Sequence, residues 1–150
     1  DDNIDNLFCT DTSISSSDSR DKADITNFTQ GLSFITKMQP VTYKWDRRSW
    51  YLPKDEDGNV TDADITKVTR DGSKKDNETH VGFLAQDVET LEKEIGFASD
   101  ENNRLFTNLT EDGKRYGIKY ERLVTVLVNA VKELDTKLTA AEARIKTLEG

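Results

Sequence analysis

The most regular pattern of hydrophobic positions lies at the C-terminal end of the chain. From Tyr120 onward, apolar residues recur in alternating steps of three and four, the a and d spacing of a coiled coil. One series is Val124, Val131, Leu138 and Ile145, and the other is Tyr120, Leu127, Leu134, Ala141 and Leu148. The pattern predicts a helix from about Glu121 to Glu149, on the order of 40 Å long at ~1.5 Å per residue.

Charged residues beside this seam favour parallel association of several copies. Lys137 with Glu142, and Arg144 with Glu149, have opposite charge and the spacing of g and following e positions. Valine at a with leucine at d favours dimers, whereas a wider apolar face in the first heptad suits a higher oligomer or a helix wedged against the globular part. The residues that widen it are Val128 and Ala130. A single amphipathic helix on its own domain is the alternative interpretation.

A second apolar stripe, of helical spacing, lies nearer the N-terminus. Ile25, Phe28, Leu32 and Ile35 follow one another at steps of three, four and three within the range 18–37. Asp21 or Asp24 is a candidate cap for this predicted helix, which Pro40 would end. Gly31 weakens the prediction a little.

Short strands are predicted between the two helical patterns. Residues Val41–Asp46 alternate and are rich in strand-forming types, and His80–Val88 changes from a strand into a helix that continues to about Ile95. Leu105–Phe106 and Tyr116–Tyr120 form two further strands, with Glu111–Lys114 as the turn between them. The predicted fold class is therefore α+β, with a small globular part and a long C-terminal helix.

The range 53–77 is polar and has no clear apolar face. It contains two turn signals, Asp57-Gly58 and Asp71-Gly72, with a strand-like alternation over Ala63–Val68 between them. A segment of this length is long for a loop in a compact domain, so we predict a protruding arm that is too polar to form its own core. The alternative is an ordinary surface loop.

Composition limits the classes of partner. The 150 residues are 34% hydrophobic and 33% charged, with a net charge of −8, so nucleic acid and anionic membranes are poor candidates. The apolar runs are too short to span a bilayer, and the acidic N-terminus does not resemble a signal peptide. The core should be modest, which leaves burial for subunit association to supply. Because the chain starts at Asp1 without methionine, we expect residues 1–17 to be the end of a longer protein.

Candidate chemistry is confined to a few residues. Ser17 and Lys22 are five positions apart, and a lysine can activate a serine where desolvation or nearby positive charge favours its neutral form. A solvated loop or a helix cap explains the same serine-rich stretch equally simply. If Lys22 begins the predicted helix, the pair meets only where the preceding chain folds back. His80 is a weaker catalytic candidate than a structural group at a strand end, and with Cys9 it makes no metal-site or disulfide pattern.

Several motifs, taken together and in order, resemble one known family. They are Ser17-Asp18-x-Arg20-x-Lys22-x-x-Ile25, Pro40-Val41-x-Tyr43-x-Trp45, Val81-Gly82-Phe83-Leu84-Ala85-Gln86-Asp87-Val88, Tyr116-Gly117-Ile118-Lys119-Tyr120 and Val131-Lys132-Glu133-Leu134. The chain is similar to the C-terminal intramolecular chaperone domains of phage tail spikes and tail fibres, a self-cleaving Ser–Lys peptidase family. The likeness is strongest to the members in L-shaped side tail fibres of siphophages.

The resemblance implies a homotrimer with a parallel coiled coil, which helps an upstream β-helical fibre of the same polypeptide to fold. It implies cleavage of the Ser17–Asp18 bond, with Ser17 and Lys22 as catalytic residues and Asp18 or Arg20 in support, Arg20 or backbone amides being candidate oxyanion donors. Residues 1–17 would stay with the fibre and 18–150 would be the released chaperone. A dyad assembled by tertiary and subunit contacts would link cleavage to completed folding.

The resemblance also implies a place of action. The chaperone would act in the cytoplasm of the host bacterium during assembly, and the mature fibre would serve host adhesion in the virion tail. The range 53–77 falls where the family carries arms that embrace the fibre. We expect no cofactor and no metal site.

Two other function classes remain open. One is a non-catalytic coiled-coil trimerisation module of a fibrous protein, in which Ser17 and Lys22 only cap a helix. The other is a serine hydrolase that acts on outside substrates, which is disfavoured because no histidine or aspartate motif accompanies the serine.

Overall fold

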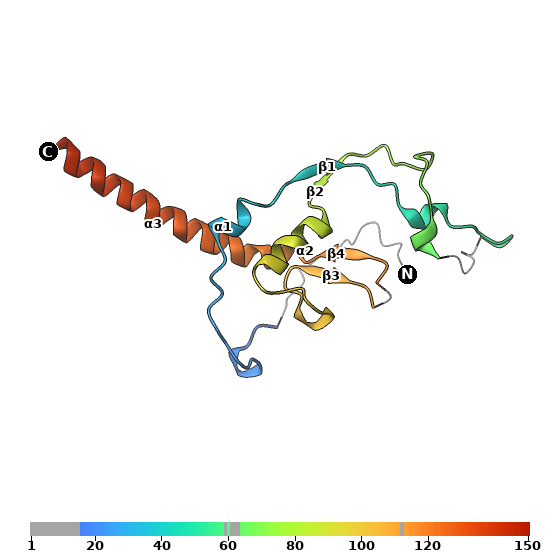
Figure 1. The fold of residues 1–150 in the computed structure, drawn as a ribbon, viewed down its shortest axis with the longest axis horizontal. Helices are drawn as coiled ribbons and strands as arrows, with labels where there is room; N and C mark the ends of the chain where they lie inside the picture. The colour runs from blue at the N-terminus through green and yellow to red at the C-terminus, as the bar shows by residue number, and fades with distance from the viewer. Residues whose placement is uncertain (1–15, 59, 61–63, 112) are drawn as a thin grey trace.

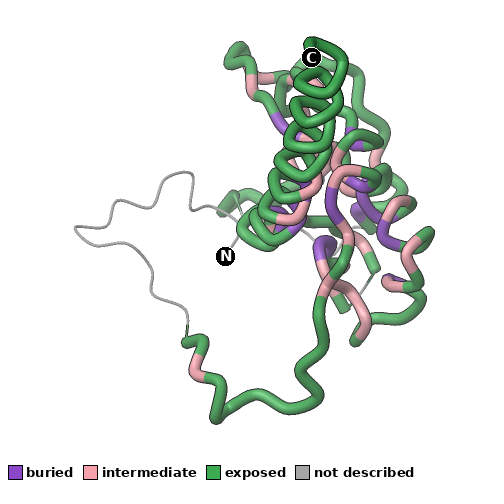
Figure 2. Tube along the Cα trace, turned by 90° about the vertical axis from the view of Figure 1, so that its left-hand side faces the viewer, coloured by how far each residue is buried: buried purple, intermediate pink, exposed green. Residues whose placement is uncertain are grey.

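The computed structural model describes residues 16–58, 60, 64–111 and 113–150. The long helix α3 (Leu123–Glu149) projects from a small α+β body, and the segment between strands β1 (Val41–Tyr43) and β2 (His80–Gly82) extends from the opposite end (Figure 1). Figure 2 shows that burial is concentrated in the body and in the first turns of α3. This arrangement confirms the predicted fold class. None of the described helices is long and apolar enough to cross a membrane.

Helix α2 (Ala85–Glu94) lies against a two-stranded hairpin of strands β3 (Thr107–Leu109) and β4 (Tyr116–Ile118). A Schellman motif ends α2: Gly96 has φ +87°, its N–H bonds to the carbonyl of Lys93, and the N–H of Phe97 bonds to that of Glu92. In the hairpin, Thr107 pairs with Ile118 and Leu109 pairs with Tyr116. Strand and helix are thus close to where the sequence places them.

Strands β1 and β2 form a separate antiparallel ladder in which Val41 pairs with Gly82 and Tyr43 pairs with His80. The ladder is held to the base of α3 because the Phe83 N–H donates to the Tyr120 hydroxyl at 3.1 Å. A Cβ built on Gly82 would lie 2.7 Å from that same hydroxyl, so only glycine permits the approach.

Six buried side chains form the core between α2, the hairpin and α3. They are Phe34, Met38, Val88, Phe106, Leu123 and Val126. The Phe34 and Phe106 rings lie 5.2 Å apart, and Phe28 meets Phe106 edge-on at 6.1 Å. Apolar burial of this kind is the main source of stability, so these contacts fix the first turns of α3 to the body.

The predicted helix over 18–37 is wrong for most of its length. Only α1 (Leu32–Ile35) is α-helical, and Ile25, the first residue of the supposed stripe, is 70% exposed. Asp24 has φ 51°, which no α-helix permits, and the following stretch Thr26–Gln30 contains weak helix formers. Phe28 reaches the core from extended chain instead.

Close packing on α3 explains where α1 begins. A Cβ on Gly31 would lie 3.0 Å from the backbone nitrogen of Ala130, so the two segments touch backbone to backbone. The Asn129 amide donates to the carbonyl of Phe28 at 2.8 Å, and the Glu133 carboxylate accepts from the Leu32 N–H at 3.2 Å. Gly31 therefore matters for contact with α3, not for its helix propensity.

Residues 44–79 form the arm between β1 and β2. It contains two 3₁₀ turns, η2 (Arg48–Tyr51) and η3 (Ile65–Lys67), so the strand-like alternation over Ala63–Val68 does not mark a strand in its described part. Leu52 and Ile65 are 9% and 8% exposed. Leu52 lies just before the predicted range of 53–77 and Ile65 lies within it, so the described part of that range supplies one buried apolar side chain, which agrees with the expectation that it is too polar to form its own core. We call Leu52 and Ile65 together the small core of the arm.

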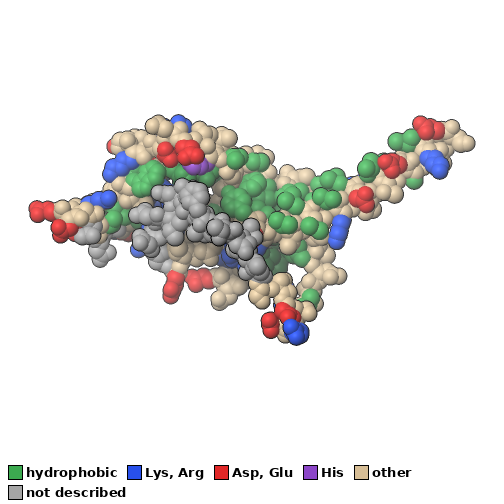
Figure 3. All heavy atoms as spheres, turned by 180° about the vertical axis from the view of Figure 1, so that it is seen from behind, with side chains coloured by type: hydrophobic (Ala, Val, Ile, Leu, Met, Phe, Trp, Pro, Cys, Tyr) green, Lys and Arg blue, Asp and Glu red, His purple; other side chains and the backbone are tan. Residues whose placement is uncertain are grey.

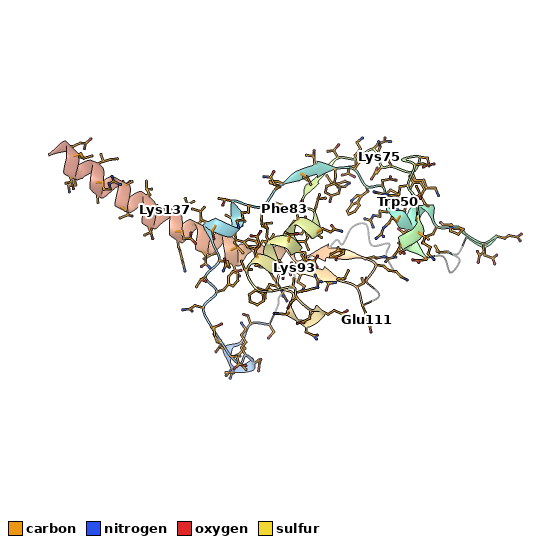
Figure 4. All side chains as sticks on the ribbon, viewed as in Figure 1. Trp50, Lys75, Phe83, Lys93, Glu111 and Lys137 are labelled. Atoms are coloured by element: carbon orange, nitrogen blue, oxygen red, sulfur yellow. The ribbon has the colours of Figure 1, made fainter. Side chains whose placement is uncertain are left out.

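Aromatic and cationic side chains add to this small core. The Arg47 guanidinium lies 4.4 Å from the centroid of the Trp45 ring and 5.9 Å from that of Trp50. Figure 4 shows Trp50 within the arm and Phe83 beside α2. The returning chain is tied to the outgoing one where the Asp76 N–H donates to the Trp45 carbonyl at 2.8 Å. The described part of the arm is therefore an extension of the β1–β2 ladder.

Candidate functional site

Ser17 and Lys22 are brought together. The Lys22 amine donates a hydrogen bond to the Ser17 hydroxyl, with 2.7 Å between Nζ and Oγ. Both side chains are exposed, and the segment that carries them lies apart from the body in Figures 1 and 2. The contact between the two predicted site residues therefore forms at the surface of the described part of the chain.

A 3₁₀ turn, η1 (Ser19–Asp21), brings the two residues into range. Asp18 is its N-cap, and the carboxylate accepts the Arg20 N–H at 2.9 Å. The Asp21 N–H bonds to the Asp18 carbonyl at 3.2 Å, and the Lys22 N–H bonds to the Ser19 carbonyl at 3.3 Å. Aspartate is among the preferred N-cap residues because its short side chain reaches these amides.

The Asp18 carboxylate also forms an ion pair with Arg20. Nη2 of Arg20 lies 2.6 Å from Oδ2, and Nε lies 3.1 Å from each carboxylate oxygen. The side-chain hydrogen bonds from Arg20, and then the bond from its backbone N–H, hold the pKa of Asp18 below its ordinary value. The same contact raises the pKa of Arg20. Asp18 is therefore an ionised acceptor near neutral pH.

Asp18 and Arg20, the two residues expected to support catalysis, form an ion pair with each other. Nε and Nη2 of Arg20 are directed at Asp18, so Arg20 is held beside the turn and not beside the Ser17 hydroxyl. An oxyanion of a cleaved peptide bond requires preorganised donors. Backbone amides of the junction are the other donors that the sequence offers.

The chemistry open to Ser17 and Lys22 depends on desolvation. An exposed lysine ammonium is charged near neutral pH and cannot take a proton from serine. Removal of water favours the neutral amine, which can act as a general base. In the single chain a local turn already sets the distance between Ser17 and Lys22 without tertiary contacts, and the expected contribution of subunit contacts to the dyad stays a prediction.

His80 has a structural setting on β2. Its ring stacks on Tyr43, with centroids 5.6 Å apart and planes at 26°, and lies 6.1 Å from the Trp45 ring. Its Nε2 atom is buried and has no hydrogen-bond partner among the described residues. The ring thus lies among aromatic side chains, whereas Ser17 and Lys22 contact each other, which agrees with the structural interpretation of His80.

One group of potential metal ligands was missed in the sequence. Oxygen atoms of Asp76 and Glu78 and a ring nitrogen of His80 lie within 4.8 Å of one another in the described structure. Their spacing at i, i+2 and i+4 is the signal that could have found them, because such spacing places side chains on one face of a strand. Figure 3 shows the histidine beside acidic side chains at the surface. Exposed carboxylates often lie together without an ion, so we assign the group no role.

Helix α3 presents two different apolar faces. Leu123, Val126 and Ala130 are buried against the body. Of the two residues predicted to widen the apolar face, Ala130 thus packs on the globular part, whereas Val128 is 47% exposed. The a and d positions stay exposed: Leu127 is 47%, Leu134 is 51% and Leu148 is 85% accessible. Figure 3 shows hydrophobic side chains along this helix. A helix with an exposed stripe of this length is typical of a coiled-coil strand.

The range 1–15, with Cys9, lies outside the described residues, so its predicted role as fibre end stays a prediction. A family model described as chaperone of endosialidase matches residues 17–97, which is more than half of the chain. A comparison with curated proteins gives no match. The matched region begins at Ser17 and contains the turn, α1, both strands of the first ladder, the arm and α2.

Proposed function

The chain belongs to the chaperone of endosialidase family, whose members are self-cleaving peptidases with a chaperone role in tail spike folding, and from this premise we propose its specific task. It is the C-terminal chaperone of a phage tail fibre or spike. It trimerises, assists folding of the fibre that precedes it, and releases itself by cleavage between Ser17 and Asp18. The reaction takes place in the host cytoplasm, and the fibre left behind serves host adhesion in the virion.

The 2.7 Å contact between Lys22 Nζ and Ser17 Oγ is the observation that carries the proposal. In the reaction, a neutral Lys22 takes the hydroxyl proton and the Ser17 oxygen attacks the carbonyl carbon of the scissile bond. The C–N bond breaks, the Asp18 nitrogen leaves as an amine after accepting a proton, and water hydrolyses the ester. Attack by a serine on its own carbonyl would close a strained small ring, which attack on a neighbouring chain avoids.

The exposed a and d positions of α3 support assembly. Val131 and Leu138 are 63% and 59% exposed in the single chain, and burying such side chains is worth on the order of 1.5–3 kcal/mol each. Three parallel copies would cover these residues along the seam. Assembly would also bring other surfaces near the exposed turn at Ser17, and thereby remove water from Lys22.

Three variants of the chain that retains residues 1–17 test the chemistry. Ser17→Ala removes the nucleophile, Lys22→Ala removes the base, and Lys22→Arg keeps a charge that does not deprotonate near neutral pH. We expect all three to remain uncut, as gels and intact mass show, with unchanged circular dichroism. Normal cleavage of Lys22→Arg would exclude Lys22 as the base.

A non-catalytic trimerisation module is the second candidate, favoured by the exposed apolar stripe of α3. Under this alternative the Ser17–Lys22 contact only closes a turn. The wild-type chain decides between the two, because a module without activity stays intact during expression whereas a self-cleaving chaperone yields a fragment that begins at Asp18.

A further inference from the structure

We propose that Asp18 and Arg20 are positioning residues that set the distance between Ser17 and Lys22 before assembly, so that assembly supplies desolvation and the neighbouring chain's carbonyl but not the contact between Ser17 and Lys22. This inference rests on the proposed cleavage at Ser17–Asp18 and assigns two neighbouring side chains to that same site. It differs from a direct catalytic role, because neither residue exchanges a proton or an electron pair with the reacting atoms.

The isolation of the turn is the first reason. No residue of η1 is buried, and every hydrogen bond or ion pair that the structure describes for residues 17–22 stays within this range. Among the described residues, hydrophobic packing therefore does not hold the turn in place. Its shape must come from polar contacts between its own residues.

The Asp18 carboxylate is the centre of these contacts. One oxygen caps the turn by accepting the Arg20 N–H at 2.9 Å, and the other receives Nη2 of the same residue at 2.6 Å. Backbone and side chain of Arg20 thus close on one carboxylate, which tightens the chain between Ser17 and Lys22. Glutamate is too long for this cap, whereas asparagine keeps the acceptor and loses the ion pair.

The protonation state of Asp18 excludes the main alternative. Arg20 lowers the pKa of the Asp18 carboxyl, so this group is an ionised carboxylate near neutral pH. It therefore has no proton to donate to the leaving amine. Its contribution is therefore to geometry. Small losses of alignment between reacting groups reduce rates strongly.

The experiment measures the rate at which the fragment beginning at Asp18 appears after a short pulse of cell-free synthesis. The variants are Asp18→Ala, Asp18→Asn, Arg20→Ala and the double variant Asp18→Ala with Arg20→Ala. We expect Asp18→Ala to slow cleavage about fivefold or more, the loss typical of a removed N-cap. Asp18→Asn should recover most of the rate, because the cap is kept.

The double variant distinguishes positioning from direct action. If Asp18 and Arg20 act as one unit, the double variant is no slower than Asp18→Ala. If Arg20 instead stabilises the oxyanion, the two losses multiply and the proposal is overturned. In Asp18→Ala the pH at half-maximal rate should stay unchanged while the plateau falls; a shifted midpoint also overturns it.

Two controls separate this inference from the cleavage proposal. Asp21→Ala removes an exposed carboxylate from the same turn, and its rate should equal the wild-type rate. Light scattering should give the wild-type oligomer mass for every variant, so that a slower reaction is not a folding defect. Cleavage in Ser17→Ala would refute the proposed function itself. A block in Ser17→Ala with a wild-type rate in Asp18→Ala would refute the positioning role alone.

Discussion

The Glu92 carboxylate accepts a hydrogen bond from the Thr107 hydroxyl at 2.6 Å, and neither residue is exposed to solvent. The same carboxylate accepts backbone N–H groups of Leu105, Phe106 and Thr107, the last two at 2.9 and 3.1 Å. One side chain of α2 thus accepts hydrogen bonds from the backbone N–H groups at the start of β3. Strand pairing begins at Thr107 and not at the predicted Leu105, and the backbone amides of Leu105 and Phe106 donate to Glu92 instead of to a neighbouring strand.

Substitution of Glu92 should therefore lower the free energy of unfolding. In Glu92→Gln an amide NH₂ would face other donors, and we expect a loss of about 2–3 kcal/mol; Glu92→Ala leaves buried N–H groups unpaired and should cost about 3–5 kcal/mol. Urea unfolding at one fixed chain concentration measures both. Glu94→Gln is the control, because its partner Lys37 forms an exposed ion pair at 2.7 Å. Glu92→Gln within about 0.5 kcal/mol of wild type would contradict this role.

Stability should depend on pH through Glu89. Burial raises the pKa of its carboxyl, but hydrogen bonds from Arg104 at 2.7 Å and Lys93 at 3.2 Å outweigh burial and hold the pKa below its ordinary value of 4.5. Because the folded pKa is lowered, the stabilisation is complete above pH 4.5 and is lost as the pH falls through the folded value. The difference in unfolding free energy between wild type and Glu89→Gln should thus be largest at neutral pH and shrink in acid. A constant difference would mean that the ion pair does not contribute.

Features with a local cause could be predicted from the sequence. The seven-residue repeat of α3 follows from side chains that neighbour one another along one helix, and the hairpin follows from turn residues such as Gly113 between two short apolar runs. Ser17 and Lys22 were identified as residues, although the turn that joins them was not expected. The residue that could have indicated this turn is Asp18, because aspartate caps the start of a short turn as readily as that of a long helix.

Features with a distant cause could not be predicted in this way. The stripe from Ile25 to Ile35 has helical spacing, yet contact of Gly31 with α3 and of Phe28 with Phe106 decides the path of the chain. Glu92 reads as a surface residue of an acidic helix, because its partners lie in another element. Tertiary contacts of this kind override the local preference for a helix, and they cannot be recognised in a short stretch of sequence.

Assembly should depend on the seam of α3. Leu134→Glu would place like charges at one layer of the predicted trimer, where they have no partners, and we expect it to dissociate the assembly. Light scattering at micromolar concentration gives the mass. Thr136→Glu is the matched control: Thr136 lies on the same exposed helix but away from the a and d positions, and this variant should keep the wild-type mass. A Leu134→Glu variant with the wild-type mass would place the seam elsewhere.

The arm should be dispensable for the chaperone and necessary for the fibre. Replacement of residues 54–77 with a short Gly/Ser linker removes Ile65 from the small core but leaves the β1–β2 ladder and α2. We expect the isolated chaperone to assemble as before. With the complete fibre attached, we expect insoluble, uncleaved chains, because strand edges that the arm shields would aggregate. Soluble and correctly cleaved fibres would show that the arm is an ordinary surface loop.

Ser17 and Lys22 lie on opposite sides of the proposed scissile bond, so cleavage of this bond would be irreversible for the dyad. In the proposed reaction Ser17 leaves with the fibre, whereas Lys22 stays at the start of the released chain, so the 2.7 Å contact cannot re-form. Cleavage would therefore separate the two dyad residues of the chain that is cut. Under the proposed reaction each chain would lose its dyad when that chain is cut, and the finished fibre would keep the serine without the lysine.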